Sequence, residues 1–185
     1  MLIIDNYDSF TYNIVQYIKI LGINPIVVKN DELTLEQIKR LEFSRIILSP
    51  GWGNPANSGI TMDVIDFYKD KKTILGVCLG MQCIAKYFGA DIVNAPQPCH
   101  GKNSEIYFNE DFLLFRGLKQ GFSATRYHSL IVEAFGSEII ITARTKDNLP
   151  MALEIRNKKV YGVQFHPEAI LTENGIRIFE NFINM

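Results

Sequence analysis

The chain has 185 residues, a length typical of one domain and sufficient to bury a hydrophobic core without disulfides or structural metals. Hydrophobic residues make up 47% of the chain and charged residues 21%, which excludes an intrinsically disordered protein. The formal net charge is −1, so electrostatics gives no reason to expect a nucleic acid or an anionic membrane as a partner.

The apolar runs and the cysteines indicate the compartment. No run approaches the roughly 18–20 apolar residues of a membrane span. The N-terminal segment has no basic region and carries Asp5 and Asp8, which is unlike a secretory signal. The 3 cysteines include no Cys-x-x-Cys pair, which argues against a disulfide framework and against a structural zinc site. We therefore expect a soluble, cytoplasmic protein with a single domain over residues 1–185.

The first half of the chain alternates short apolar runs, which predict strands, with apolar residues spaced by three and four, which predict helices. The expected strands are 2–4, 26–28, 46–48 and 73–77, and the expected helices are 10–21, 35–41 and 59–68. Apolar strands separated by amphipathic helices are typical of a parallel sheet covered on both faces, in which ligands bind at the carboxyl ends of the strands. We therefore expect a site where 5–9, 49–55 and the residues from Cys78 onward meet.

The second half has a different pattern, because strand-like runs follow one another with turn residues between them. These runs are 104–108, 122–126, 138–143, 151–155 and 160–165. Residues 157–159 predict a hairpin between the last two runs, and a closing helix follows from the shared face of Ile176, Phe179 and Ile183. The whole chain is expected to form one mixed α/β domain.

The segment Gly76-Val77-Cys78-Leu79-Gly80 contains the first candidate for chemistry. An apolar strand runs into Cys78 with a glycine two residues to either side, as in hydrolases that place a nucleophile on a sharp strand-to-helix turn. The following helix would direct its N-terminus at the sulfur, which favours the reactive thiolate. A buried cysteine at a strand end more often serves packing, so on this segment alone both roles stay open.

A second apolar strand ends at His166-Pro167-Glu168. Residues two apart in an extended segment project to the same side, and Pro167 holds His166 in the extended region. A histidine with a carboxylate on its own side forms the base and orienting half of a catalytic triad. A lone histidine before proline would be structural, but in combination with the cysteine turn we interpret His166 as catalytic.

Other candidates give weaker signals. Two glycines and two prolines fix the loop Ser49–Pro55, which is either a tight turn or a loop that brings a backbone N–H close to a developing oxyanion. His100 and His128 lack the spacing of metal ligands, and we interpret them as structural or surface residues, with His100 in a polar loop. Cys83 falls on the helix after Cys78 and is expected in the core. No metal site is expected.

Together these motifs resemble those of the class I glutamine amidotransferases, over nearly all 185 residues. The opening stretch Asp5–Asn13 resembles in particular the glutaminase subunits of anthranilate synthase and aminodeoxychorismate synthase. His100–Lys102, Arg126–Leu130 and Ile170–Gly175 match the same subfamily. The resemblance implies a flavodoxin-like, three-layer α/β fold with a mostly parallel central sheet, helices on both faces and an additional small antiparallel sheet.

The resemblance also implies roles for individual residues. Cys78 would attack the side-chain amide of glutamine to form a γ-glutamyl thioester, and His166, oriented by Glu168, would transfer the protons. Backbone N–H groups of Gly53 and Leu79 would form the oxyanion hole. The residues expected to bind glutamine or to form the oxyanion hole are Gly51, Trp52, Gly53, Leu79, Gln82, Ser129 and Leu130.

A separate synthase subunit that binds chorismate is the implied partner. Ammonia loses its nucleophilicity on protonation, so a docked partner and a sheltered route are expected. The Mg²⁺ that the amination needs would belong to that subunit, and no cofactor is expected in this chain. Residues 5–12, the Gly51 loop and 100–102 are where the interface is expected. Whether the product is anthranilate or aminodeoxychorismate stays open.

Three residues depart from the usual family pattern, none of them at a triad position. Met81 stands where histidine is common, Trp52 alters the Gly51 loop, and Ala169 stands where serine is common. Two alternatives to a glutamine-hydrolysing subunit remain. A non-catalytic scaffold subunit of the same complex is disfavoured by the complete triad, and a stand-alone cysteine hydrolase is disfavoured by the subfamily matches.

Overall fold

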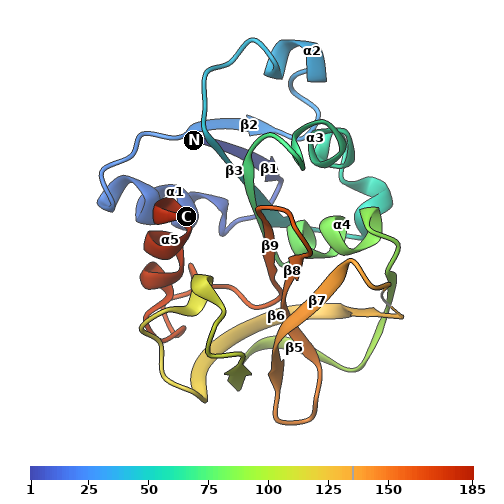
Figure 1. The fold of residues 1–185 in the computed structure, drawn as a ribbon, viewed down its shortest axis with the longest axis vertical. Helices are drawn as coiled ribbons and strands as arrows, with labels where there is room; N and C mark the ends of the chain where they lie inside the picture. Colours follow the sequence, from blue (N-terminus) through green and yellow to red (C-terminus); the bar gives the residue numbers. More distant parts are fainter. Residues whose placement is uncertain (135) are drawn as a thin grey trace.

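The computed structural model describes residues 1–134 and 136–185. In these residues nine strands form one continuous sheet in the order β2-β1-β3-β4-β9-β8-β7-β5-β6 (Figure 1). The strands are β1 (Leu2–Asn6), β2 (Ile26–Lys29), β3 (Arg45–Gly51), β4 (Thr73–Val77), β5 (Asp91–Phe108), β6 (Phe122–Glu133), β7 (Ile139–Thr145), β8 (Pro150–Ile155) and β9 (Val160–Val163). The helices are α1 (Thr11–Ile20), α2 (Leu35–Ile38), α3 (Thr61–Tyr68), α4 (Leu79–Tyr87) and α5 (Gly175–Asn184), with short 3-10 turns η1 (Pro55–Asn57) and η2 (Leu113–Phe115).

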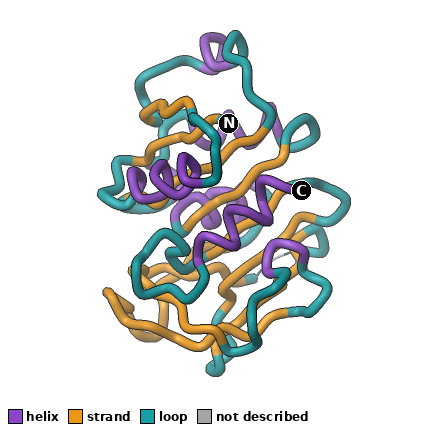
Figure 2. Tube along the Cα trace, turned by 90° about the vertical axis from the view of Figure 1, so that its left-hand side faces the viewer, coloured by secondary structure: helices purple, strands orange, loops and turns teal. Residues whose placement is uncertain are grey.

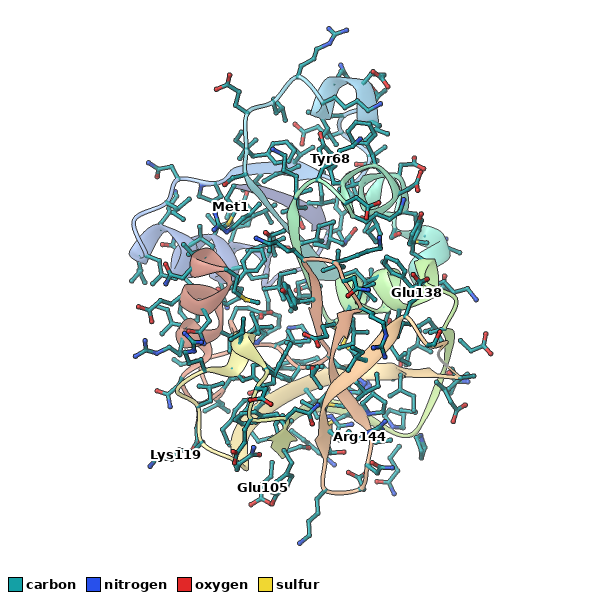
Figure 3. All side chains as sticks on the ribbon, in the orientation of Figure 1. Met1, Tyr68, Glu105, Lys119, Glu138 and Arg144 are labelled. Carbon is teal, nitrogen blue, oxygen red and sulfur yellow. The ribbon has the colours of Figure 1, made fainter. Side chains whose placement is uncertain are left out.

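Five neighbouring strands of the sheet run parallel: β2, β1, β3, β4 and β9. This agrees with the alternating pattern of the first half of the chain. Successive residues of each strand point to opposite faces, which creates two apolar layers. Ile47 of β3 packs in the layer that contains α1 and α5, whereas Ile46 and Leu48 pack in the layer that contains α3 and α4. The two helix pairs lie on opposite sides of the sheet in Figure 1, and Figure 2 views the side with α1 and α5. Side chains fill both spaces between helices and sheet (Figure 3).

The remaining strands are antiparallel and continue the same sheet. β9 pairs in parallel with β4 on one edge and antiparallel with β8 on the other, so it joins the two halves. The predicted hairpin at 157–159 connects β8 to β9, with Asn157 in the left-handed region at φ 60°. The antiparallel strands expected as an additional sheet are therefore present, but they are hydrogen-bonded to the parallel sheet through β9 rather than separate from it.

The largest difference from the predicted elements is the length of β5. The sequence predicts a strand over 104–108 and a polar loop around His100, whereas β5 extends from Asp91 to Phe108 and includes His100. Its first part is mostly exposed, and its pairing with β6 is interrupted between Asn94 and Cys99. Prolines and polar side chains are tolerated in such a bulged segment, so the apolar pattern that identifies a buried strand is missing.

Candidate active site

Cys78 and His166 follow neighbouring strands of the sheet. Val77 of β4 lies opposite Val163 of β9, and the Cys78 N–H donates to the Val163 carbonyl oxygen at 2.8 Å. The residues after both strands therefore emerge at the same carboxyl edge, although they are far apart in the sequence. The Ser49–Pro55 loop leaves the next strand, β3, at this edge. The structure thus brings together the segments that the sequence analysis places there.

Cys78 occupies a sharp turn between β4 and α4. Its backbone angles are φ 51° and ψ −104°, a conformation that residues with side chains rarely adopt. Gly80 packs directly against β3, and a β-carbon there would collide with the Leu48 carbonyl oxygen. A β-carbon at Gly76 would in turn collide with the backbone of Gly80. The two glycines are therefore required by close backbone approach, and they hold the cysteine on the turn that the sequence predicts.

His166 and Glu168 form a buried pair. His166 Nδ1 lies 2.6 Å from Glu168 Oε1, and both residues are 2% exposed. Burial alone would lower the pKa of His166, but the Glu168 carboxylate and the nearby Cys78 outweigh it and raise that pKa well above 6.5. His166 Nε2 has no hydrogen-bond partner among the described residues, so this nitrogen is free to exchange a proton.

Two aromatic rings cover the imidazole of His166. The ring centroids of Phe10 and Tyr127 lie 5.6 and 5.2 Å from it, both in edge-on arrangements. They exclude water from the pair on this side, which strengthens its electrostatic interactions. Sequence analysis identified neither aromatic residue as part of the site, because nothing in the spacing places α1 and β6 beside His166.

A cavity of about 280 Å³ opens beside Cys78 and His166. Six residues expected to bind glutamine line this cavity: Gly51, Trp52, Gly53, Gln82, Ser129 and Leu130. Leu79, whose expected contribution is its backbone N–H, is not among the residues that line it. The lining also includes Asp8 and Ser9, from the segment 5–9 that the sequence places at this edge. It further includes residues that sequence analysis did not assign to the site: Phe10, His100, Tyr127 and His128.

His128 is a buried cavity residue rather than a surface residue. Its Nε2 accepts a hydrogen bond from Arg126 Nε at 3.0 Å, which fixes the proton on Nδ1, 2.9 Å from the Leu130 carbonyl oxygen. Burial, reinforced by the Arg126 charge, lowers the pKa of His128 to about 4. His128 is therefore neutral near pH 7 and holds the Leu130 carbonyl in place.

The three departures from the family pattern have simple places in the structure. Met81 is fully buried against Gly162 of β9, with its Cγ 2.7 Å from where a β-carbon of Gly162 would lie. Ala169 is buried and its N–H donates to the His166 carbonyl oxygen. Trp52 lines the cavity and is 79% exposed. None of them displaces a member of the candidate triad.

Residues 1–134 and 136–185 contain neither a membrane-spanning helix nor a cluster of metal-binding side chains. No helix there is long and apolar enough to cross a membrane. No group of three or more His, Cys, Asp or Glu side chains there is arranged to hold a metal ion.

Comparison with known proteins identifies the family. Residues 2–185 match the family described as Glutamine amidotransferase class-I. The chain belongs to this family of enzymes.

Similar proteins support the same family. The chain is 48% identical to anthranilate synthase component 2 of Cyanophora paradoxa, covering 100% of this chain and 98% of that protein. It is 45% identical to aminodeoxychorismate/anthranilate synthase component 2 of Bacillus subtilis, covering 99% and 95%. Among solved structures, a protein from Thermoplasma acidophilum described as one subunit of a GMP synthase superposes with a TM-score of 0.88 at 26% identity, covering 99% of this chain and 91% of that one.

Proposed function

We propose that this chain hydrolyses L-glutamine to glutamate and ammonia and supplies the ammonia to a chorismate-binding synthase subunit. The observation that carries the proposal is the meeting of Cys78 with the buried His166–Glu168 pair at one cavity. A cysteine on a strained turn beside a histidine oriented by a carboxylate is the arrangement needed for covalent acyl transfer.

The chemistry follows from the positions of these groups. The Cys78 thiolate attacks the side-chain carbonyl carbon of glutamine, and His166 Nε2 protonates the departing nitrogen, which leaves as ammonia. The neutral imidazole then removes a proton from water, which attacks the thioester and releases glutamate and the thiolate. Glu168 holds the imidazole through Nδ1 during both steps. The N–H groups of Gly53 and Leu79 stabilise the oxyanion, and no cofactor of this chain takes part.

The substrate side of the cavity supports glutamine as the acyl donor. The Gly51–Gly53 loop, Gln82, Ser129 and Leu130 supply backbone and amide groups suited to the α-amino and carboxylate groups of an amino acid. The site is polar but carries few formal charges, which suits a zwitterionic substrate.

The partner is proposed from the names of the relatives and from the surface around the cavity. Both component 2 proteins described above are named as parts of synthases that make anthranilate or aminodeoxychorismate. Trp52 and Tyr127 expose aromatic surface at the cavity, which a docked subunit would cover. The Mg²⁺ for amination of chorismate is assigned to that subunit.

The test is glutamate release from glutamine, measured with and without each candidate chorismate-binding subunit. We expect release that the correct partner stimulates and that Cys78→Ser abolishes. Cys99→Ser is the matched control, because Cys99 does not line the cavity and its thiol contacts the Lys102 carbonyl oxygen instead, and it should retain activity. Absence of release with every partner, while added ammonia still supports synthesis, would identify a scaffold subunit and overturn the proposal.

A further inference from the structure

Gln164 contacts the sulfur of the candidate nucleophile. It follows β9 directly, is fully buried, and its backbone N–H donates to the Met151 carbonyl oxygen at 2.8 Å. Its side-chain Nε2 lies 3.6 Å from Cys78 Sγ and donates a hydrogen bond to it. The sulfur therefore has a side-chain amide beside it in addition to the imidazole of His166.

The direction of this hydrogen bond is fixed by a neighbouring glutamine. Gln82 Nε2 lies 3.2 Å from the Leu130 carbonyl oxygen and 3.1 Å from Gln164 Oε1. A backbone carbonyl can only accept, so the atom of Gln82 that faces Leu130 must be the nitrogen. The same nitrogen faces Gln164, which must therefore present its oxygen to Gln82 and its nitrogen to Cys78. The amide cannot flip without placing two donors or two acceptors together.

The Leu130 carbonyl that anchors this arrangement is itself held. His128 Nδ1 donates to it, and Arg126 fixes the tautomer of His128. A chain of hydrogen bonds therefore runs from β6 across the cavity wall to the sulfur. The side chains that form it are buried, and the Leu130 carbonyl that two of them contact is partly buried.

A donor at this position favours one charge state of the sulfur. Cys78 is only 6% exposed, so its thiolate loses most of its hydration. A hydrogen bond to a charged acceptor is about twice as strong as one to a neutral acceptor, so Gln164 stabilises the thiolate more than the thiol. The same donor stabilises the sulfur when it leaves the thioester.

We propose that Gln164 is a further catalytic residue, which holds Cys78 as a thiolate through a side-chain amide whose orientation Gln82 fixes. The inference rests on the proposed function only in taking Cys78 as the nucleophile. It assigns the glutamine before Phe165-His166 a direct contact with a reacting atom, beyond the triad and the substrate-binding residues.

The test is the rate of Cys78 alkylation by iodoacetamide as a function of pH in the free protein, followed by peptide mass spectrometry. Gln164→Met retains the side-chain length but removes the donor, and Gln164→Glu retains the shape but places a carboxylate oxygen beside the sulfur. In both variants we expect the midpoint of the pH profile to move upward by about one to two pH units.

The shape of the profile separates this role from a structural one. A more basic thiolate is intrinsically more nucleophilic, so the variants should react about 3- to 10-fold more slowly at low pH and faster than the wild type at high pH. A merely distorted site would not produce profiles that cross. Cys99 in the same samples is the internal control, and its alkylation should be unchanged.

The outcomes for this inference and for the proposed function are distinct. Profiles that superimpose for the wild type and both variants, with unchanged unfolding in urea, would overturn the role of Gln164 even if the complex hydrolyses glutamine. Crossing profiles would support it even if glutamine proved not to be the substrate. Glutamate release in the complex, measured separately, reports on the proposed function alone.

Discussion

His128 and His166 line the same cavity, but the charges beside them are opposite in sign. Glu168 and Cys78 raise the pKa of His166, so its contribution to stability is present below pH 6.5 and is lost as the pH rises through its folded-state pKa. Burial and the Arg126 charge lower the pKa of His128 to about 4. As the pH is lowered from 6.5 to about 4, the unfolded chain therefore takes up a proton at His128 that the folded chain does not. The free energy of unfolding falls over this range as the pH falls.

This difference predicts the effect of His128→Gln on acid stability. We expect the free energy of unfolding of the wild type to fall by about 2 kcal/mol between pH 7 and pH 5 through His128 alone. The glutamine variant has no titrating group at this position, so that part of the loss should disappear. Urea unfolding of the wild type and the variant at pH 7 and pH 5 measures this difference in the free energy of unfolding. His100→Gln, on the exposed part of β5, is the control, and a loss in His128→Gln equal to that of the wild type would contradict the assignment.

At the scale of elements, the loop after β9 is attached to the outer edge of β6. The Thr125 carbonyl accepts from the His166 N–H at 2.9 Å, and the Thr125 N–H donates to Thr172 Oγ1 at 3.0 Å. Thr172 Oγ1 also donates to the His166 carbonyl oxygen at 2.7 Å. Glu173 pairs with Ser123 through both its backbone and its side chain. The loop thus covers the sheet edge and fixes the backbone of His166.

Thr172→Val should therefore weaken both folding and catalysis. The buried Thr125 N–H would lose its partner, which costs about 1–3 kcal/mol of unfolding free energy. The His166 backbone would lose an anchor, and we expect a fall of about tenfold in kcat for glutamine hydrolysis in the complex. Urea unfolding and steady-state kinetics measure the two effects.

Thr142→Val is the matched control for this substitution. Thr142 Oγ1 is buried without a hydrogen-bond partner among the described residues, so removing it should leave stability unchanged or slightly increased. Equal losses in the two variants would show that the hydrogen bonds of Thr172 are not the cause.

Elements whose apolar residues recur at regular spacing could be predicted from the sequence, and elements without that pattern could not. The helix over 10–21 and the strand over 73–77 were predicted close to their observed bounds because their buried residues are periodic. The helix predicted over 35–41 ends at Ile38, because the following N–H groups of Arg40 and Leu41 bond to carbonyls three residues back rather than four. The first part of β5 was missed because its pairing is bulged and its side chains face solvent.

In the candidate site too, local sequence patterns predict some residues and miss others. Cys78, His166 and Glu168 could be predicted because strand, turn and glycine spacing are local features. Gln164 and Tyr127 could not, because their contacts to the site depend on which strands become neighbours in the sheet. The parallel pairing of β4 with β9 is a long-range choice that no local pattern specifies.

At the scale of the whole molecule, the two halves of the sheet differ in burial. β1 and β4 are buried along their full length, whereas the first part of β5 is mostly exposed. Amides of β1 and β4 should therefore exchange with solvent only on global unfolding, and those of residues 94–102 should exchange at least roughly 100-fold faster through local opening. Hydrogen exchange followed by mass spectrometry tests this, and equal protection of the two segments would contradict it.

The central place of β9 has a consequence for synthesis of the chain on the ribosome. β4 is complete once Val77 has been made, but β9, its neighbour on one side, begins only at Val160. The unpaired backbone N–H and C=O groups on that edge of β4 therefore stay open while the intervening segment is translated. At translation rates of roughly 5–20 residues per second this interval lasts about 4 to 16 seconds. During that time Cys78 has no histidine beside it, so the site is assembled only when the sheet closes. The nascent chain therefore carries an open strand edge, a hazard for aggregation, while its catalytic chemistry is still absent.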